Sequence, residues 1–431
     1  MIPKKIFIFI TRAMYFVMLL QASPLGWAQS LPDVRTGLDI VVADSFRVFR
    51  GKSIGLVTNH TAVDQSGVHI VELFRSASEI ELRALFGPEH GIAGYAEAGD
   101  KVTHQTDASS GLQVYSLYGE TRKPTPAMLA EVDALVFDMQ DVGARFYTYI
   151  STMALALAAA AEADIEFYVL DRPNPIGGKV EGPVLDPRNR SFVGIYPIAL
   201  RHGMTVGELA RMFVGEGWIF AEPDDSSAAA TPDNWHKLTV IQMSGWRRSQ
   251  LFEATGLRWL APSPNMPSPT TALLYPGMCL LEATNCSEGR GTAEPFVLIG
   301  APWLESNELA GRLNAAFGAL HASPVQFTPI SIPGRASSPK FQDIVCNGLR
   351  FEVMQPEALE SVKAGIALLW HLSALYPNEF KIRRSGMIRL TGAEWLVEMI
   401  EQTRPLDSIY ARLDQEAMRF CRDRAPYLLY D

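Results

Sequence analysis

The sequence places a glutamate and a histidine on a turn that could bring them into a cleft. Residues 86–91 read FGPEHG, so Glu89 and His90 follow a short apolar run and are framed by Gly and Pro residues that fix the backbone direction. A glutamate on the floor of a partly apolar cleft has its ionised form disfavoured, and this environment suits a general acid. The alternative is a turn glutamate that only forms an ion pair with a nearby arginine.

A second segment, residues 138–149, reads DMQDVGARFYTY and gathers two carboxylates, an amide, an arginine and two tyrosines. Hydroxyl-rich ligands need many hydrogen-bond donors and acceptors, which these side chains supply, and aromatic faces stack on sugar rings. A helix start in which Asp141 caps and Arg145 forms a helical ion pair would explain only two of these residues. The segment supplies the candidate site residues Asp138, Gln140, Asp141, Arg145 and Tyr147.

A third segment, residues 285–292, reads NCSEGRGT and closely follows Glu282. Two glycines around Arg290 predict a tight loop that presents charged groups, and an arginine can bind a carboxylate through two parallel hydrogen bonds. The segment matches neither of the glycine-rich phosphate-binding patterns, so it does not indicate a nucleotide site. Its candidate site residues are Glu282, Asn285, Glu288 and Arg290.

The N-terminal two-thirds of the chain alternates short apolar runs with amphipathic stretches. Continuous apolar strands separated by helices are typical of a parallel sheet that is covered on both faces. We therefore predict an α/β protein with a Rossmann-like, doubly wound parallel sheet in residues 37–261 and a second, smaller α/β domain in residues 262–431. The expected strands are residues 54–58, 82–86, 134–137 and 166–170, and the expected helices are residues 68–74 and 148–163.

Polar residues gather where each expected strand stops. In open α/β sheets, ligands bind outside the carboxyl ends of the strands, so these clusters should meet in one cleft. The clusters are Asn59 with His60, Glu89 with His90, residues 138–145, and Arg172 with Asn174.

Other classes of function have less support in the sequence. The formal net charge is −9, and no basic run resembles a surface that binds nucleic acid. No GxSxG segment exists, so a serine esterase of the α/β-hydrolase type is unsupported. No HExxH segment exists either, but His60, His90, Asp138 and Asp141 are of types that can bind zinc, which leaves a metal-dependent hydrolase open.

The first 28 residues differ in character from the rest of the chain. Two lysines precede two apolar runs, and the small residues Gly26 and Ala28 end the segment. This order predicts a signal peptide at residues 1–28 and a protein that is periplasmic or secreted after its removal. A membrane anchor is the alternative, but Arg12 leaves each apolar run short of the roughly 20 residues that span a bilayer. No later stretch is long and apolar enough to form a stable membrane span.

Several longer segments resemble the NamZ-type exo-β-N-acetylmuramidases, a family long catalogued only as a domain of unknown function. The resemblance runs from about Gly37 to the C-terminus and implies a Rossmann-like domain, a smaller C-terminal domain and an active site in the cleft between them. Tyr95 and Cys286 depart from the family pattern and could alter how the substrate fits. The matching segments are GLVTNHTAV, LFGPEHGIAG, VFDMQDVGARFYTYISTM, LDRPNPIGG, EGPVL, LRHGMTVGELA, PSPNMPS and TNCSEGRGTAEPFVLIGAPW.

The resemblance also implies a reaction. The family releases N-acetylmuramic acid (MurNAc) from the non-reducing ends of peptidoglycan fragments, in which MurNAc is joined to N-acetylglucosamine (GlcNAc), during cell-wall turnover and recycling. Glu89 matches the glutamate that the resemblance makes catalytic. Glycosidases usually need two carboxylates, and the second could be Glu288, Glu282 or Asp138, unless the 2-acetamido group of MurNAc itself attacks the anomeric carbon. We expect neither a metal nor another cofactor.

MurNAc differs from GlcNAc by a lactyl carboxylate, and an arginine is the natural ligand for this group. The candidates are Arg145, Arg172 and Arg290. Two other functions stay open on the sequence: a metal-dependent hydrolase of amide or ester bonds in the cell wall, and a cell-wall-binding protein without catalysis. Nucleic acid and nucleotides are not expected as partners.

Overall fold

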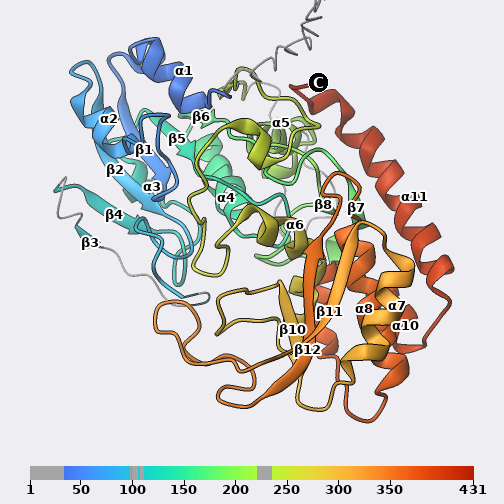
Figure 1. The fold of residues 1–431 in the computed structure, drawn as a ribbon. Coiled ribbons are helices and arrows are strands. Elements are labelled where there is room, and N and C mark those ends of the chain that lie inside the picture. The colour runs from blue at the N-terminus through green and yellow to red at the C-terminus, as the bar shows by residue number, and fades with distance from the viewer. Residues whose placement is uncertain (1–33, 98, 100–104, 107–110, 221–234) are drawn as a thin grey trace, which may run out of the picture.

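The computed structural model describes residues 34–97, 99, 105–106, 111–220 and 235–431. The predicted signal peptide lies outside these residues. Figure 1 shows an N-terminal α/β layer in blue and green and a C-terminal part in orange and red that packs beside it. None of the helices in the described ranges is long and apolar enough to cross a membrane.

A sheet of seven strands forms the centre of the N-terminal part within the described residues, in the order β3-β4-β2-β1-β5-β6-β9. All neighbouring strands are parallel except the short β3, which runs antiparallel to β4. The winding starts at β1, runs outward through β2 to β4, and then resumes at β5 on the other side of β1. This is the Rossmann order that the sequence predicted. The strands are β1 (Ser53–Thr58), β2 (Glu81–Gly87), β3 (Gln105–Thr106), β4 (Gln113–Ser116), β5 (Ala134–Asp138), β6 (Glu166–Leu170) and β9 (Leu238–Ile241).

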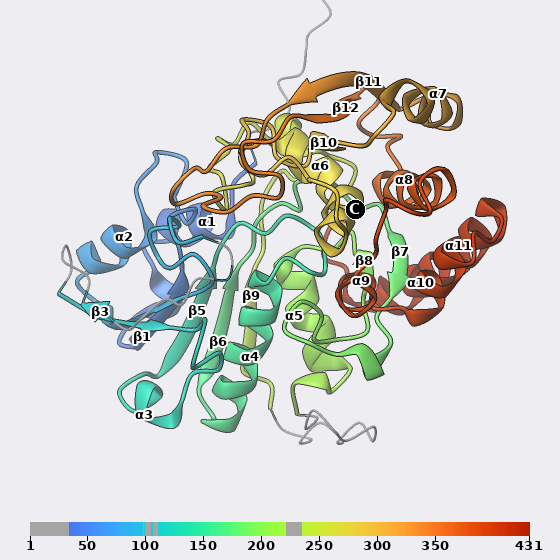
Figure 2. The ribbon, with the colours of Figure 1, turned by 90° about the horizontal axis from the view of Figure 1, so that it is seen from below.

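Helices cover both faces of this sheet because its central strands are apolar on both sides. On one face, Leu56 and Val136 belong to a core cluster that includes Leu38 of α1 and Phe74 of α2. On the other face, Leu135 belongs to the main core, to which α4 and α5 contribute. Figure 2 shows α4 and α5 together on one side of the sheet. The helices are α1 (Gly37–Ala43), α2 (Ile70–Ser76), α3 (Pro126–Leu129), α4 (Tyr149–Glu162) and α5 (Val206–Gly215).

The C-terminal part combines helices with a three-stranded antiparallel sheet in the order β10-β12-β11. A separate hairpin-like pair, β7 with β8, lies between the two parts and packs against α11. The main hydrophobic core continues from α4 into α6 and α8, so the two parts share one core. The elements are β7 (Glu181–Val184), β8 (Ala199–Arg201), α6 (Pro269–Met278), β10 (Leu298–Ala301), α7 (Ser306–Ala316), β11 (Leu320–Phe327), β12 (Cys346–Val353), α8 (Ser361–Leu375), α9 (Arg384–Thr391), α10 (Glu394–Glu401) and α11 (Leu406–Arg424).

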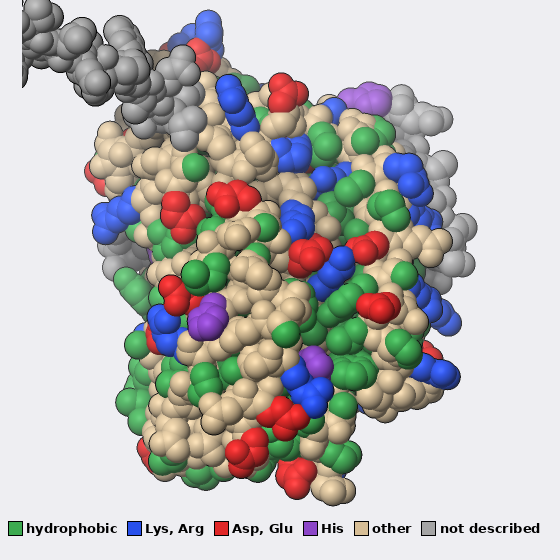
Figure 3. Space-filling model, turned by 45° about the vertical axis from the view of Figure 1, so that its right-hand side comes forward, with side chains coloured by type: hydrophobic (Ala, Val, Ile, Leu, Met, Phe, Trp, Pro, Cys, Tyr) green, Lys and Arg blue, Asp and Glu red, His purple; other side chains and the backbone are tan. Residues whose placement is uncertain are grey.

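Charged side chains are mixed in sign over the face of the molecule that Figure 3 shows. Lys and Arg side chains lie among Asp and Glu side chains there. Exposed ion pairs in the described residues, such as Arg312 with Glu308 on α7, follow the same pattern. Pairs of this kind contribute little to stability, so the fold depends mainly on its shared core.

Candidate active site

A pocket of about 340 Å³ lies where the carboxyl ends of the sheet strands meet the C-terminal part. Both parts of the chain line it, as expected for a site in the cleft between two domains. The lining residues are Glu89, His90, Tyr118, Arg122, Phe146, Tyr147, Thr148, Tyr149, Ser191, Phe192, Val193, Ser263, Asn265, Met266, Tyr275, Cys279, Glu282, Arg290, Phe296, Arg389 and Leu390.

Glu89 is held at the wall of this pocket by two hydrogen bonds. β2 ends at Gly87, and the turn that follows gives His90 a left-handed backbone conformation with a φ of 71°. Thr148 Oγ1 donates to Glu89 Oε2 over 2.6 Å, and the Gly99 backbone N–H donates to Oε1 with an N–O distance of 3.0 Å. Both oxygens of the half-buried carboxyl group are therefore oriented before any ligand arrives.

An aromatic wall, formed by Tyr147, Tyr149, Tyr275 and Phe296, borders the pocket. The ring centroids of Tyr147 and Tyr149 are 4.8 Å apart, and those of Tyr275 and Phe296 are also 4.8 Å apart. Burial raises the pKa of Tyr147 and of Tyr149, so both hydroxyl groups stay protonated near neutral pH. The Tyr149 hydroxyl donates to the Pro262 carbonyl over 2.5 Å. These nearly buried rings form much of the apolar lining of the pocket.

Glu282 is the second carboxylate among the described residues that line the pocket. Arg290 Nη2 lies 2.6 Å from Glu282 Oε1, and its guanidinium lies 5.2 Å from the centre of the Phe296 ring. Burial by itself lowers the pKa of Arg290, but the carboxylates of Glu282 and Glu288 outweigh it and raise that pKa above its ordinary value. Arg290 is therefore a permanent cation that forms an ion pair with Glu282.

Glu288 does not line the pocket, although the sequence made it a catalytic candidate. The residue is 4% exposed, and its carboxylate lies 2.9 Å from Lys340 Nζ and 3.5 Å from Arg290 Nε. The same lysine also donates to backbone carbonyls of Leu281 and Cys286. Glu288 thus belongs to a buried ionic network beneath Arg290 and stabilises the loop that carries it.

Asp138 is likewise absent from the pocket lining. It is completely buried, and both of its oxygens accept hydrogen bonds from the Arg172 guanidinium, at 2.5 Å from Nε and 3.0 Å from Nη2. Arg172 Nη2 also donates to the Val63 carbonyl. This bidentate pair joins the ends of β5 and β6, so neither residue is placed for catalysis or for binding the lactyl carboxylate in this pocket.

Arg145 is the third arginine that the sequence predicted as a ligand of the lactyl carboxylate. Its guanidinium instead donates hydrogen bonds to backbone carbonyl groups. The residue is 1% exposed. Nη1 donates to the Pro183 and Ile198 carbonyls, and Nη2 donates to the Leu390 and Thr391 carbonyls. Arg145 therefore ties the β7–β8 region to the end of α9 instead of binding a ligand.

The segment of residues 257–266 divides the carboxyl edge of the sheet that we expected to form one cleft. His60 Nε2 lies 2.9 Å from the Ala261 carbonyl oxygen, and burial lowers the pKa of His60, so the neutral ring donates this hydrogen bond. A Cβ on Gly94 would lie 2.1 Å from the His60 ring, so the turn after Glu89 packs directly on it. The side chain of Asn59 is buried and accepts hydrogen bonds from Thr61. His60 thus holds the turn after Glu89 against this segment, and neither Asn59 nor His60 lines the pocket.

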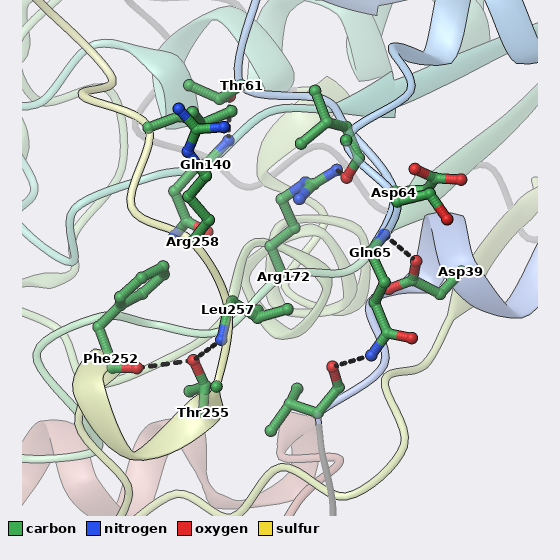
Figure 4. Close-up of a pocket in the computed structure, with 16 residues that line it drawn as sticks. Asp39, Thr61, Asp64, Gln65, Gln140, Arg172, Phe252, Thr255, Leu257 and Arg258 are labelled. Atoms are coloured by element: carbon green, nitrogen blue, oxygen red, sulfur yellow. Dashed lines mark hydrogen bonds between the residues drawn. The ribbon is translucent and has the colours of Figure 1, made fainter.

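A second pocket of about 570 Å³ lies beside this segment and takes in two of the predicted site residues, Gln140 and Arg172. Figure 4 shows both side chains among the residues that line it, together with Arg258. Gln140 Nε2 donates to the Pro173 carbonyl over 2.8 Å, and Asp39 Oδ1 accepts from the Gln65 backbone N–H over 2.8 Å. Most polar groups of this second pocket are thus already hydrogen-bonded within the protein.

The remaining predicted residues hold loops in place. Asp141 Oδ2 accepts from the Gly143 N–H over 2.7 Å. Asn174 accepts from the Ile176 N–H and donates to the Met204 carbonyl. Asn285 donates to the Glu379 carbonyl and accepts from the Lys381 N–H. Short polar side chains in such turns commonly bind nearby backbone groups, and the sequence cannot tell this role from ligand binding.

Of the predicted site residues, the pocket contains Glu89, His90, Tyr147, Glu282 and Arg290. The sequence reasoning did not select Thr148 and Tyr149, although both lie in the polar segment that ends at residue 149. It also did not select Arg122 and Arg389, which lie outside every segment singled out above. Only long-range packing brings these two arginines to the site. Ser263 and Asn265 were present in a family segment, and nothing in their types marked them as pocket residues.

The four residues that the sequence offered for a metal do not form a common site. In the ranges that the structure describes, no three His, Cys, Asp or Glu side chains gather in an arrangement that could hold a metal ion. His60 is hydrogen-bonded to the Ala261 carbonyl, and the Asp138 carboxylate is paired with Arg172.

A pocket that contains two carboxylates is typical of enzymes that hydrolyse glycosidic bonds. Comparisons with known proteins agree with this class. The model of the N-terminal domain of the exo-β-N-acetylmuramidase NamZ matches residues 54–270, and the model of its C-terminal domain matches residues 273–430. The chain belongs to the NamZ exo-β-N-acetylmuramidase family, and it is a glycosidase.

Individual relatives extend this result to almost the full chain. The chain is 43% identical over 433 residues to the peptidoglycan β-N-acetylmuramidase NamZ of Bacillus subtilis (strain 168), covering 99% of this chain and 100% of that protein. Two crystal structures of DUF1343 family proteins from Bacteroides fragilis NCTC 9343 are also similar, with TM-scores of 0.82 and 0.73 and identities of 33% and 32%. Each comparison covers 93% of this chain and 99% of the other.

Proposed function

We propose that the active-site pocket binds the terminal MurNAc unit of peptidoglycan-derived MurNAc–GlcNAc saccharides and that Glu89 is the general acid that releases it. The observation that carries this proposal is the orientation of both Glu89 oxygens by Thr148 and Gly99 inside a pocket that also contains Glu282. A compact pocket of this size suits the end of a glycan better than the middle of a long strand, in keeping with exo action.

The chemistry follows from these two carboxylates. Glu89 gives its proton to the glycosidic oxygen as the bond from this oxygen to the anomeric carbon breaks. The transition state carries positive charge near the anomeric carbon, which a carboxylate stabilises. Glu282, which pairs with Arg290, is the carboxylate of the pocket that supplies that negative charge. Water adds to the anomeric carbon and loses a proton, which restores the protonated Glu89.

We assign the second carboxylate to Glu282, and not to Glu288 or Asp138, because only Glu282 can reach a substrate in the pocket. Glu282 lines the pocket, whereas Glu288 and Asp138 are buried in ion pairs outside it. A reacting group must reach the substrate, and neither buried carboxylate meets this geometric condition. Glu282→Gln should therefore lower kcat much more than Glu288→Gln lowers it at equal folded fraction.

We further propose that the protein is exported, because residues 1–28 have the order of charges and apolar residues of a signal peptide and because peptidoglycan lies outside the cytoplasm. N-terminal sequencing of protein taken from the periplasm or the medium tests this. A chain that starts near Gln29 is expected, and an intact N-terminus on membrane-bound protein would contradict cleavage.

The experiment that tests the function uses a chromogenic β-MurNAc glycoside with the mature protein. Wild type should release the chromophore with and without EDTA, and Glu89→Gln should lose about 10²- to 10⁴-fold of kcat, the usual contribution of an acid. Glu294→Gln is the matched control, because Glu294 is only partly buried and pairs with Arg350 away from the pocket. Loss of activity in EDTA would point to a metal-dependent hydrolase, and a fully active Glu89→Gln would remove Glu89 from the chemistry.

A further inference from the structure

Two arginines of the active-site pocket have no acidic partner among the described residues. Arg122 follows β4, and Arg389 lies in the last turn of α9. Both line the pocket that contains Glu89. The Arg122 guanidinium lies 4.5 Å from the centre of the Phe192 ring, an arrangement that holds the cation in place without neutralising it.

The charges of the pocket do not balance without a ligand. Arg290 is paired with Glu282, so Glu89 is the one other carboxylate that lines the pocket together with Arg122 and Arg389 among the described residues. Both arginines are exposed to solvent, and neither forms an ion pair with Glu89 or with another carboxylate of the described residues. The whole chain has a formal charge of −9, so this local excess of positive charge runs against the overall composition. A pocket of this kind favours a substrate that carries an anionic group.

The two arginines lie on elements that are tied to each other. The loop that carries Phe192, beneath Arg122, begins near Asp186, whose N–H donates to the Gly392 carbonyl over 2.9 Å. Gly392 follows α9 directly and is three residues from Arg389. The loop that contacts Arg122 and the helix that carries Arg389 are therefore hydrogen-bonded to each other, although they are far apart in the sequence.

We propose that Arg122 and Arg389 bind the lactyl carboxylate of MurNAc and so make the enzyme select MurNAc over GlcNAc. This inference rests on the proposed function, because it requires a MurNAc ring beside Glu89. Guanidinium groups bind carboxylates through charge-assisted, often paired hydrogen bonds. GlcNAc carries a hydroxyl group in place of the lactyl ether, so it leaves both cations without a counter-charge in the pocket.

The test measures kcat/KM on three chromogenic substrates: the β-MurNAc glycoside, its lactyl methyl ester and the β-GlcNAc glycoside. The variants are Arg122→Gln, Arg389→Gln and the double variant. Each single change should lower kcat/KM for the MurNAc glycoside about 10- to 100-fold, as expected for a hydrogen bond between charged groups. Hydrolysis of the ester and of the GlcNAc glycoside should change little. Arg384→Gln is the matched control, because Arg384 lies on the same helix, pairs with Glu394 and does not line the pocket.

A double variant that keeps the wild-type ratio between the acid and its methyl ester would overturn the proposal. Calorimetry separates this outcome from a failure of the proposed function. Free MurNAc and free GlcNAc are titrated into Glu89→Gln and into Glu89→Gln combined with Arg389→Gln. If no substrate is hydrolysed by wild type, a MurNAc preference that disappears with Arg389 still supports the inference, whereas equal binding of both sugars before that change rejects it.

Discussion

The hydroxyl group of Thr148 donates a hydrogen bond of 2.6 Å to Oε2 of Glu89. The bond joins the residue that precedes α4 to the turn after β2, so the position of the glutamate depends on the loop that follows β5. The remaining oxygen of Glu89 accepts from the Gly99 N–H. Thr148 is therefore a positioning residue for the proposed acid.

Replacing Thr148 by valine keeps its shape and removes the donor. We expect kcat on the β-MurNAc glycoside to fall about two- to tenfold, since a hydrogen bond to a neutral carboxyl group contributes about 0.5–1.5 kcal/mol. KM should change little, because Glu89 acts on the glycosidic oxygen and not on ring recognition. Thr148→Ser restores a hydroxyl group and should recover most of kcat. A serine variant as slow as the valine variant would show that packing, and not the hydrogen bond, matters here.

Removing Arg172 should affect stability and leave substrate selection alone. Arg172→Ala leaves the buried Asp138 carboxylate without its partner, a change that usually costs about 3–5 kcal/mol. Urea unfolding measures the loss, and Arg258→Ala is the control because Arg258 lines the same second pocket but is exposed. The folded fraction of Arg172→Ala should keep the wild-type preference for MurNAc over GlcNAc. A loss of this preference would return Arg172 to the list of lactyl ligands.

The buried Asp141 predicts a specific dependence of stability on pH. Burial raises the pKa of Asp141 to about 7, because Oδ1 has no hydrogen-bond partner in the described residues and only backbone N–H groups favour the charged form. The unfolded chain releases this proton near pH 4, so the folded protein binds more protons between pH 4 and pH 7. Stability attributable to this group therefore falls as the pH rises through that window.

Asp141→Asn removes the titration and keeps an acceptor for the Gly143 N–H. Relative to wild type, the variant should gain stability from pH 4 to pH 8, by on the order of 3–4 kcal/mol at most. Unfolding curves at a series of pH values test this, with Asp343→Asn as the control because Asp343 is exposed. A stability difference that does not change with pH would contradict the assigned pKa.

The strands of the sheet could be located from the sequence because their apolar runs are continuous. The strand expected at residues 134–137 is β5, which extends one residue further, to Asp138. The helix expected at residues 148–163 is α4, which is one residue shorter at each end. The order of strands and helices then leads to a Rossmann sheet, because crossover connections of this kind are almost always right-handed. Local pattern was sufficient for this level of structure.

Only some of the residues of the active-site pocket could be predicted from the local sequence pattern. Glu89 was found because a strand end, a turn and a carboxylate coincide in one short segment. Arg145 and Arg172 were chosen by type and place, yet the structure surrounds both with acceptors from distant segments, such as the Thr391 carbonyl and the Asp138 carboxylate. A sequence does not show which polar group is already hydrogen-bonded, since its partner can lie anywhere in the chain.

The sequence by itself determined the family, the Rossmann layer and the turn that carries Glu89. Tertiary structure alone decided that Arg122 and Arg389 share the pocket with Glu89, while Asp138 and Glu288 are buried in ion pairs outside it. The physical reason is that secondary structure follows from neighbours in the chain, whereas burial and charge compensation depend on which distant segments pack together. Whether a charged side chain binds a ligand or supports the fold depends on those contacts.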